Sequence, residues 1–217
     1  MKKITTFWNY FQKNEQEILN AILLGINTDE VFSQLTKKLD YVSKRISFVI
    51  KTPLTINDKF LIIFTGGGYR KLFPKIIAFE EQAPTLKHFT SQAFIKPLQN
   101  NTKYINGTDE PCSCKNYEIK ISEIQIALLD YNIATKHIKI NLYLPEYNEL
   151  KQYEDLKSNI DWIVMQIVGE IAFRKHIKQI QLNQLPLEQI GLLSLMELPD
   201  FIEYLYKINS WKKTRQL

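Results

Sequence analysis

Cysteine, histidine and long apolar runs are scarce in this sequence, and each scarcity excludes a class of protein. Only two of the 217 residues are cysteine and three are histidine, so no disulfide framework is indicated. No apolar run reaches the roughly 18 residues that a membrane helix needs. Asn9, Gln12 and Lys13 interrupt what would have to be the apolar core of a secretion signal. We therefore expect a cytoplasmic protein with no membrane partner.

Catalytic and metal-binding motifs are also missing. The sequence contains no H-E-x-x-H, G-x-S-x-G or C-x-x-C pattern. Acidic pairs such as Glu80 and Glu81 are sequence neighbours, which do not share a helix or strand face. His88, His137 and His176 are scattered, without identifiable partners. We predict no catalytic residue, no metal and no cofactor, and the enzyme question stays open because catalytic triads are recognised by geometry rather than by order.

A dense basic stripe is absent as well. The net charge of +5 is spread along the chain, and one local basic cluster lies near the C-terminus, at Lys207, Lys212, Lys213 and Arg215. Nucleic-acid footprints usually combine a denser stripe with interleaved aromatic side chains. We interpret the cluster as a solvated helix end and expect no nucleic-acid partner.

The segment 59–97 has the pattern of a strand, a glycine turn, a helix and a second strand. The uninterrupted apolar run 60–64 is typical of a strand buried on both faces. The stripe of the following helix consists of Leu72, Phe73, Ile76 and Ile77, with Glu80 as a further candidate. The helix ends by Ala83, because a residue before proline avoids the α region. Residues 89–95 predict a strand that pairs in parallel if the helix makes a crossover.

The turn at Gly66, Gly67 and Gly68 supports two interpretations. A glycine turn that opens a helix offers backbone N–H groups to an anion, and Arg70 and Lys71 would add positive charge. Neither the P-loop nor the dinucleotide fingerprint is present, however. The second interpretation is a tight connection with surface basic residues, in which at least one glycine has positive φ.

The chain before residue 59 predicts two helices and one strand. We expect a helix over 5–24, then a helix that begins with a capping box between Asn27 and Glu30, then a half-buried strand over 45–51. Aromatic side chains recur on the first helix, at Phe7, Trp8, Tyr10 and Phe11. Helical spacing of aromatics favours core packing over a ligand platform.

Beyond residue 116 the alternation of apolar residues predicts three strands, over 117–121, 124–128 and 138–144. A period of two cannot change face without an extra residue, so 122–123 marks a break. A long helix is predicted over 156–171, with Gly169 packed closely against a neighbour. Glu170 lies just off the apolar stripe, which favours the solvated face; the alternative is that it faces an apolar pocket and acts as an acid. A short strand follows at 177–182, and a capping box between Ser194 and Glu197 opens the last helix.

Residues 98–116 are rich in turn-forming residues, which indicates a sub-domain boundary or a flexible insert. They include Cys112 and Cys114, two thiols that lack the further ligands of a tetrahedral zinc site. We expect both thiols to be reduced, exposed and free of metal. The whole pattern predicts a single α+β domain over 1–217, with a mainly antiparallel sheet of five or six strands. Helices would pack on one face, with the option of one parallel pair.

Three short motifs resemble those of an uncharacterised bacterial protein family, a domain of unknown function. They are F-W-x-x-F at Phe7, Trp8 and Phe11, A-P-x-L at Ala83, Pro84 and Leu86, and F-x-x-P at Phe94 and Pro97. The resemblance covers the first half of the chain and V-G-E at 168–170, and many relatives carry tryptophan where this chain has Phe89. The family has no established activity, so the resemblance implies no catalytic residue.

Two functional hypotheses follow. The first is a non-enzymatic cytoplasmic module that binds another protein, because the motifs of catalysis are missing from a well-formed scaffold. The second is a small-molecule binding protein or enzyme that holds an anion or phosphate at Gly66–Gly68 with Arg70 and Lys71. A concave polar pocket beside the turn would favour the second hypothesis, and an exposed apolar patch would favour the first.

Overall fold

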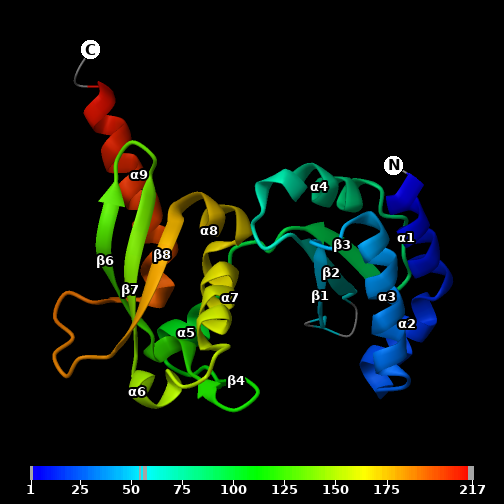
Figure 1. The fold of residues 1–217 in the computed structure, drawn as a ribbon, viewed down its shortest axis with the longest axis horizontal. Helices are drawn as coiled ribbons and strands as arrows, with labels where there is room; N and C mark the ends of the chain where they lie inside the picture. Colours follow the sequence, from blue (N-terminus) through cyan, green and yellow to red (C-terminus); the bar gives the residue numbers. More distant parts are fainter. Residues whose placement is uncertain (1, 54, 56–57, 215–217) are drawn as a thin grey trace. The chain divides into compact units, whose positions relative to one another are not determined.

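The structure is a computed structural model that describes residues 2–53, 55 and 58–214, with side chains described up to residue 207. The chain divides into two compact units, residues 1–95 and 96–217 (Figure 1). Both units contain helices and strands, which confirms the predicted α+β class. No helix among these described residues is long and apolar enough to cross a bilayer. The side chains of Lys212 and Lys213, and Arg215 as a whole, lie outside the described part.

The first unit contains four α-helices and three strands among its described residues. In chain order they are α1 (Lys2–Lys13), α2 (Glu15–Leu24), α3 (Thr28–Val42), β1 (Ser47–Lys51), β2 (Phe60–Thr65), the short 3-10 helix η1 (Arg70–Leu72), α4 (Phe73–Glu81) and β3 (Phe89–Ala93). The strands form one sheet in the order β1-β2-β3. Strand β2 is antiparallel to β1 and parallel to β3, so α4 makes the predicted crossover and the expected parallel pair is confirmed.

The core of the first unit is built from aromatic rings of α1, β2 and α4. Phe7 and Trp8 meet Phe64 edge-on, with ring centroids 5.6 and 5.5 Å away. Phe64 stacks on Phe79 at 4.4 Å. The indole nitrogen of Trp8 donates a hydrogen bond to the carbonyl oxygen of Phe79 at 2.9 Å, which satisfies the polar atom of a buried ring. These aromatics therefore form core, as their helical spacing predicts.

Three local predictions in this unit are wrong. The helix expected over 5–24 is interrupted at Asn14, between α1 and α2. The capping box at Asn27 is absent: this residue has φ 51° and its side chain forms no cap hydrogen bond. Ile77 is 41% exposed, and Phe79 takes its expected place in the core. Position 79 lies three residues after Ile76, so it shares the stripe that faces the sheet.

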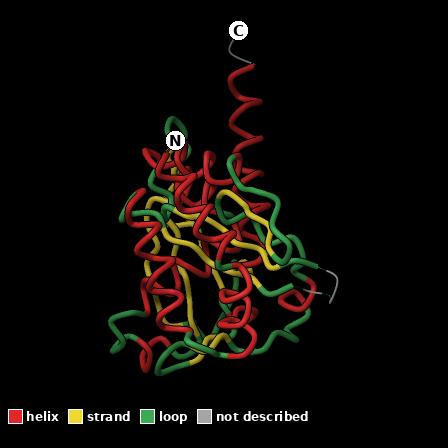
Figure 2. The backbone as a smooth tube through the Cα atoms, turned by 90° about the vertical axis from the view of Figure 1, so that its right-hand side faces the viewer, coloured by secondary structure: helices red, strands yellow, loops and turns green. Residues whose placement is uncertain are grey.

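The second unit contains the remaining elements. They are α5 (Thr102–Ile105), β4 (Cys112–Ser113), β5 (Glu118–Ile119), the 3-10 helix η2 (Ile121–Glu123), β6 (Gln125–Asn132), β7 (His137–Leu144), α6 (Tyr147–Leu150), α7 (Leu156–Val168), α8 (Glu170–His176), β8 (Ile177–Gln184), β9 (Leu193–Ser194), the 3-10 helix η3 (Leu195–Glu197) and α9 (Leu198–Thr214). Figure 2 shows the last turns of α9 extending past the rest of this unit.

Among the described residues, the strands form sheets of three, two and four strands, rather than one sheet of five or six. The four-stranded sheet has the order β8-β7-β6-β9, and β7 pairs with β8 in parallel. This second parallel pair was not predicted. It forms because α7 and α8 carry the chain back so that β8 runs in the direction of β7.

Two sequence predictions in the second unit are confirmed. The break at residues 122–123 is the 3-10 helix η2, which separates β5 from β6. At the other end, Ser194 accepts a hydrogen bond from the N–H of Met196, and Glu197 accepts one from the N–H of Ser194 at 2.8 Å. This is the capping box, and it opens η3, which leads into α9.

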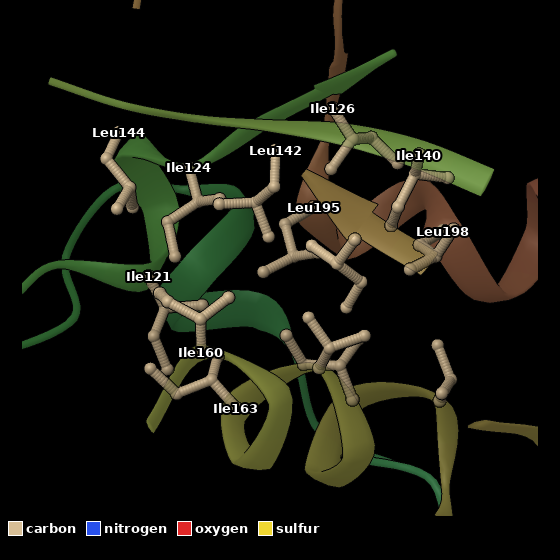
Figure 3. Packing of buried hydrophobic residues seen from close by; sticks show 14 of the residues in the cluster. Ile121, Ile124, Ile126, Ile140, Leu142, Leu144, Ile160, Ile163, Leu195 and Leu198 are labelled. Carbon is tan, nitrogen blue, oxygen red and sulfur yellow. The ribbon is translucent and has the colours of Figure 1, made fainter. Parts of the chain in front are cut away.

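The core of the second unit lies between the apolar face of α7 and the four-stranded sheet. Figure 3 shows Ile160 and Ile163 of α7 pointing toward side chains from η2, β6, β7 and η3. The labelled residues are Ile121 of η2, Ile124 between η2 and β6, Ile126 of β6, Ile140, Leu142 and Leu144 of β7, Leu195 of η3 and Leu198 at the start of α9. The stripe predicted for the long helix is therefore buried from Leu156 to Val168.

The predicted long helix ends early, at Gly169, which has φ 83° and separates α7 from α8. A Cβ atom placed at this glycine would lie 2.8 Å from Cδ of Pro97, so the expected close packing is confirmed. The break shifts the helical phase. As a result Ile171 is 50% exposed, and Glu170 is fully buried although we expected it on the solvated face.

Residues 98–116, expected as a boundary or insert, contain α5 and β4. The buried carboxylate of Asp109 accepts hydrogen bonds at Oδ2 from the N–H groups of Ile121 at 3.0 Å and Ser122 at 3.2 Å. Asp109 thereby joins this segment to η2, at the start of the four-stranded sheet.

Candidate functional site

The glycine turn has the backbone conformation that its sequence predicts. Gly67 has φ 57° and Gly68 has φ 75°, which confirms positive φ within the turn. A Cβ atom on Gly66 would lie 3.1 Å from side-chain carbons of Leu72 and Ile76. The turn is therefore shaped by the approach of η1 and α4 to the end of β2.

Two backbone N–H groups in and after the turn are used internally. The N–H of Gly67 donates to Oγ1 of Thr65 at 3.1 Å, and the N–H of Tyr69 donates to the carbonyl of Gly66 at 3.1 Å. Arg70 and Lys71 are both exposed. Two N–H groups that an anion could use are therefore already bonded within the turn and its first following residue.

The two thiols lie around the short strand β4. Cys112 belongs to β4 and Cys114 follows it. Both thiols are free and half-buried, so the expectation that they are exposed is wrong. Burial raises the pKa of Cys112, and a raised pKa weakens a thiol as nucleophile and metal ligand, because the thiolate is the reactive form. Within the described residues, no group of three or more His, Cys, Asp or Glu side chains could hold a metal.

A small polar network lies beside the thiols and was not predicted. The ring of Tyr117 stacks on Tyr153 with centroids 4.8 Å apart. Its hydroxyl accepts a hydrogen bond from Nδ2 of Asn159 at 2.8 Å and donates to Oδ1 of Asp155 at 3.3 Å. Burial raises the pKa of Tyr117 to about 12. The phenol therefore stays protonated, and the network joins Tyr117, the residue before β5, to the start of α7 rather than supplying a base.

The histidines do not form a catalytic set. Nε2 of His88 is buried without a hydrogen-bond partner among the described residues. His137 begins β7 and is half-buried. His176 is buried at the end of α8, where its Nδ1 lies 3.1 Å from the carbonyl oxygen of Lys136. Burial lowers the pKa of His176, which makes it neutral at physiological pH.

The first unit contains a groove. It has a volume of about 670 Å³ and lies between α2, α3 and β1. Its apolar lining consists of Ala21, Ile22, Phe32, Leu39, Ile46, Phe48 and Ile50, and its polar lining consists of Thr28, Thr36, Asp40, Lys44 and Ser47. Such a volume lies within the range of roughly 300–1,000 Å³ that is typical of ligand pockets. The groove does not include the glycine turn.

Local sequence accounts for both walls of the groove. Thr28, Phe32 and Thr36 recur every fourth residue on α3, which places them on one face of the helix. Phe48 and Ile50 alternate on β1 and project from one face of the strand. The rings of Phe32 and Phe48 are stacked with centroids 6.2 Å apart, so they join the two walls.

One wall of the groove is an edge strand. Strand β1 is antiparallel to β2 on one side, and no strand pairs with its other side in the part of the chain that the structure describes. Half of the backbone N–H and C=O groups of an edge strand point away from the sheet. The alternation of residues 46–50 predicts a half-buried strand, but its place at the edge was not evident from sequence because it depends on strand order.

Comparison of the chain with protein-family models, with curated proteins and with solved structures finds no match.

Proposed function

We propose that this protein is a non-enzymatic interaction module, and that the groove between α3 and β1 binds an extended segment of another protein. The observation that carries this proposal is an apolar groove of about 670 Å³ with an edge strand as one wall. Extended peptides add to exposed sheet edges through main-chain hydrogen bonds, and neighbouring pockets select every second side chain.

The dimensions of the site fit such a segment. Strand β1 has five residues, so its free edge is about 17 Å long at roughly 3.3 Å per residue. A bound strand would place alternate side chains over the half-buried rings of Phe32 and Phe48 and beside Ile50. We therefore expect a ligand with apolar residues at every second position over about five residues.

The rim of the groove has the composition of an interface. Asp40 and Lys44 are exposed and of opposite charge, and interfaces usually combine an apolar centre with a polar rim. Beside the groove in sequence, between Ile22 and Thr28, lie three exposed aliphatic residues: Leu23, Leu24 and Ile26, which are 61%, 66% and 51% exposed. Adjoining apolar side chains of this kind mark binding surfaces more often than isolated ones do.

The alternative hypothesis, an anion held at Gly66–Gly68 with Arg70 and Lys71, draws less support from the geometry. Two of the N–H groups that an anion would use are bonded within the turn. The apolar groove is lined by residues other than those of the glycine turn.

The test is to select binders from a random peptide library with the full-length protein and then to block the groove. Thr36→Arg places a long cationic side chain into the groove from an exposed position on α3. The matched control is Ser33→Arg, an exposed residue of α3 outside the lining. We expect selected peptides to lose at least about tenfold in affinity with Thr36→Arg, equivalent to about 1.4 kcal/mol, and to bind the control normally.

Backbone amide shifts of β1 in an NMR titration provide the second readout. The amides of β1 should shift when peptide is added, because the bound strand takes up their free hydrogen-bonding groups. Peptides that bind equally well to both variants and leave the amides of β1 unchanged would overturn the proposal.

A further inference from the structure

Two separate elements of the second unit place cationic groups around one tyrosine ring. Tyr206 lies in α9 and is half-buried. Nζ of Lys136, from the turn between β6 and β7, lies 3.3 Å from the centroid of its ring. Nζ of Lys175, in the last turn of α8, lies 4.8 Å from the same centroid. The tip of the hairpin and the end of α8 both lie near α9 in Figure 1.

The two ammonium groups repel each other, and neither forms an ion pair with a carboxylate among the described side chains. Because both contact the same ring, their nitrogens lie within about 8 Å, roughly one Debye length at physiological salt. Among the described side chains, ion pairs are formed by the lysines at 120, 139, 157 and 207. Neither Lys136 nor Lys175 is among them. Within the described side chains, the two positive charges therefore face the electron-rich ring and no carboxylate.

Helix electrostatics explain only one of the two lysines. Lys175 lies in the last turn of α8, where the helix dipole favours a cation. Lys136 lies outside any helix and has φ 58°, a conformation that is costly for a residue other than glycine. Its backbone is held at both ends: the N–H donates to the carbonyl of Asn132 at 2.7 Å, and its carbonyl lies 3.1 Å from Nδ1 of His176. The hairpin tip is thus anchored in the conformation that carries this ammonium group to the ring.

The phenol adds a polar group to the same point. The nearby ammonium groups of Lys175 and Lys136 lower the pKa of Tyr206. The ring of His176 meets Tyr206 edge-on with centroids 5.4 Å apart. Burial keeps that imidazole neutral by lowering its pKa, so the charge of the site comes from the two lysines.

We propose that Lys136, Lys175 and Tyr206 form an oxyanion site that binds the phosphate group of a small phosphorylated ligand. Two ammonium groups balance the double negative charge of a phosphate monoester, and their N–H donors and the phenol O–H match its several acceptor oxygens. The site lies in the second unit and is independent of the groove between α3 and β1, so either assignment can fail without the other.

The test uses inorganic phosphate and pyrophosphate as probes on the full-length protein, at an ionic strength held constant with sodium chloride. Binding to the folded state raises the melting temperature by mass action. We expect both probes to raise it, and we expect Lys136→Gln and Lys175→Gln each to weaken the apparent affinity at least about tenfold. Tyr206→Phe removes one donor and should weaken it less.

The matched control is Lys139→Gln. Lys139 lies on β7, three residues after Lys136, and its Nζ is 2.9 Å from Oδ2 of Asp130, so its charge is already compensated. The control should bind both probes like the unchanged protein. The proposal fails if neither probe stabilises the protein, or if the control and the Lys136 variant lose affinity equally. Binding of a polyanion such as heparin without binding of either probe would also overturn it, because it would show a diffuse basic surface instead of a site.

Discussion

Replacing Gly169 with alanine should change the free energy of unfolding, and the direction of the change depends on whether Gly169 lies within a continuous helix or between two helices. Inside a continuous helix, Gly→Ala is expected to stabilise by up to about 1 kcal/mol, because glycine is the poorer helix former. In the structure, Gly169 has φ 83° and ψ 149° and joins α7 to α8. A residue with a Cβ atom is strained in that conformation, which belongs almost only to glycine. We therefore expect Gly169→Ala to destabilise the protein.

The magnitude has two parts. Backbone strain at such positions costs about 1–3 kcal/mol. The new Cβ atom would also lie 2.8 Å from Cδ, 2.9 Å from Cγ and 3.0 Å from the backbone nitrogen of Pro97, and overpacking of this kind typically costs about 1–3 kcal/mol. Together they predict a loss of about 2–6 kcal/mol in the free energy of unfolding.

Urea denaturation followed by circular dichroism measures this loss. Gly107→Ala in the same unit is the matched control, since Gly107 has φ 67° but its added Cβ would meet nothing within 4 Å. It should show the strain part alone, about 1–2 kcal/mol. The double variant with Pro97→Ala should recover part of the loss from Gly169→Ala. A stability change in Gly169→Ala no larger than in Gly107→Ala would refute the role of Pro97.

Three further predictions follow from burial and charge. Ile167→Ala should lower the free energy of unfolding by about 2–5 kcal/mol in urea denaturation, because its side chain is buried. Ile171→Ala should change it by less than about 0.5 kcal/mol, because that residue is half exposed. Equal losses for the two variants would contradict the helix break after α7. Arg70→Ala combined with Lys71→Ala should change stability by less than about 0.5 kcal/mol, and a larger loss in thermal or chemical unfolding would indicate a contact that the exposed positions do not predict. His176 has a lowered pKa in the folded state because of burial, so the unfolded chain binds its proton more tightly. The contribution of His176 to stability is complete above its unfolded-state pKa of about 6.5 and is lost as pH falls through its folded-state pKa. His176→Gln should therefore flatten this part of the curve of stability against pH. An unchanged curve would show that other groups cause the pH dependence.

Several features were predictable from the sequence because they depend on neighbours along the chain. Positive φ in the turn 66–68 could be predicted because three glycines follow β2, and glycine adopts positive φ without steric cost. The capping box of Ser194 and Glu197 involves residues three apart, and the break at 122–123 follows from a shift in a period of two. The parallel pairing of β2 with β3 followed from a strand, helix and strand in succession.

Other features depend on which elements pack together, and the sequence pattern does not contain that information. The spacing of the apolar residues around Gly169 predicts a continuous helix. In the structure Gly169 instead packs against Pro97, 72 residues earlier; α7 ends at this glycine, and Glu170 after it is buried. The groove exists because β1 is at the edge of its sheet. Lys136 meets Tyr206 only through the packing of the β6–β7 hairpin against α9. Local backbone preferences act over a few residues. Each of these sites instead combines residues from elements far apart in the sequence, and which elements pack together depends on burying the apolar surface of the whole unit.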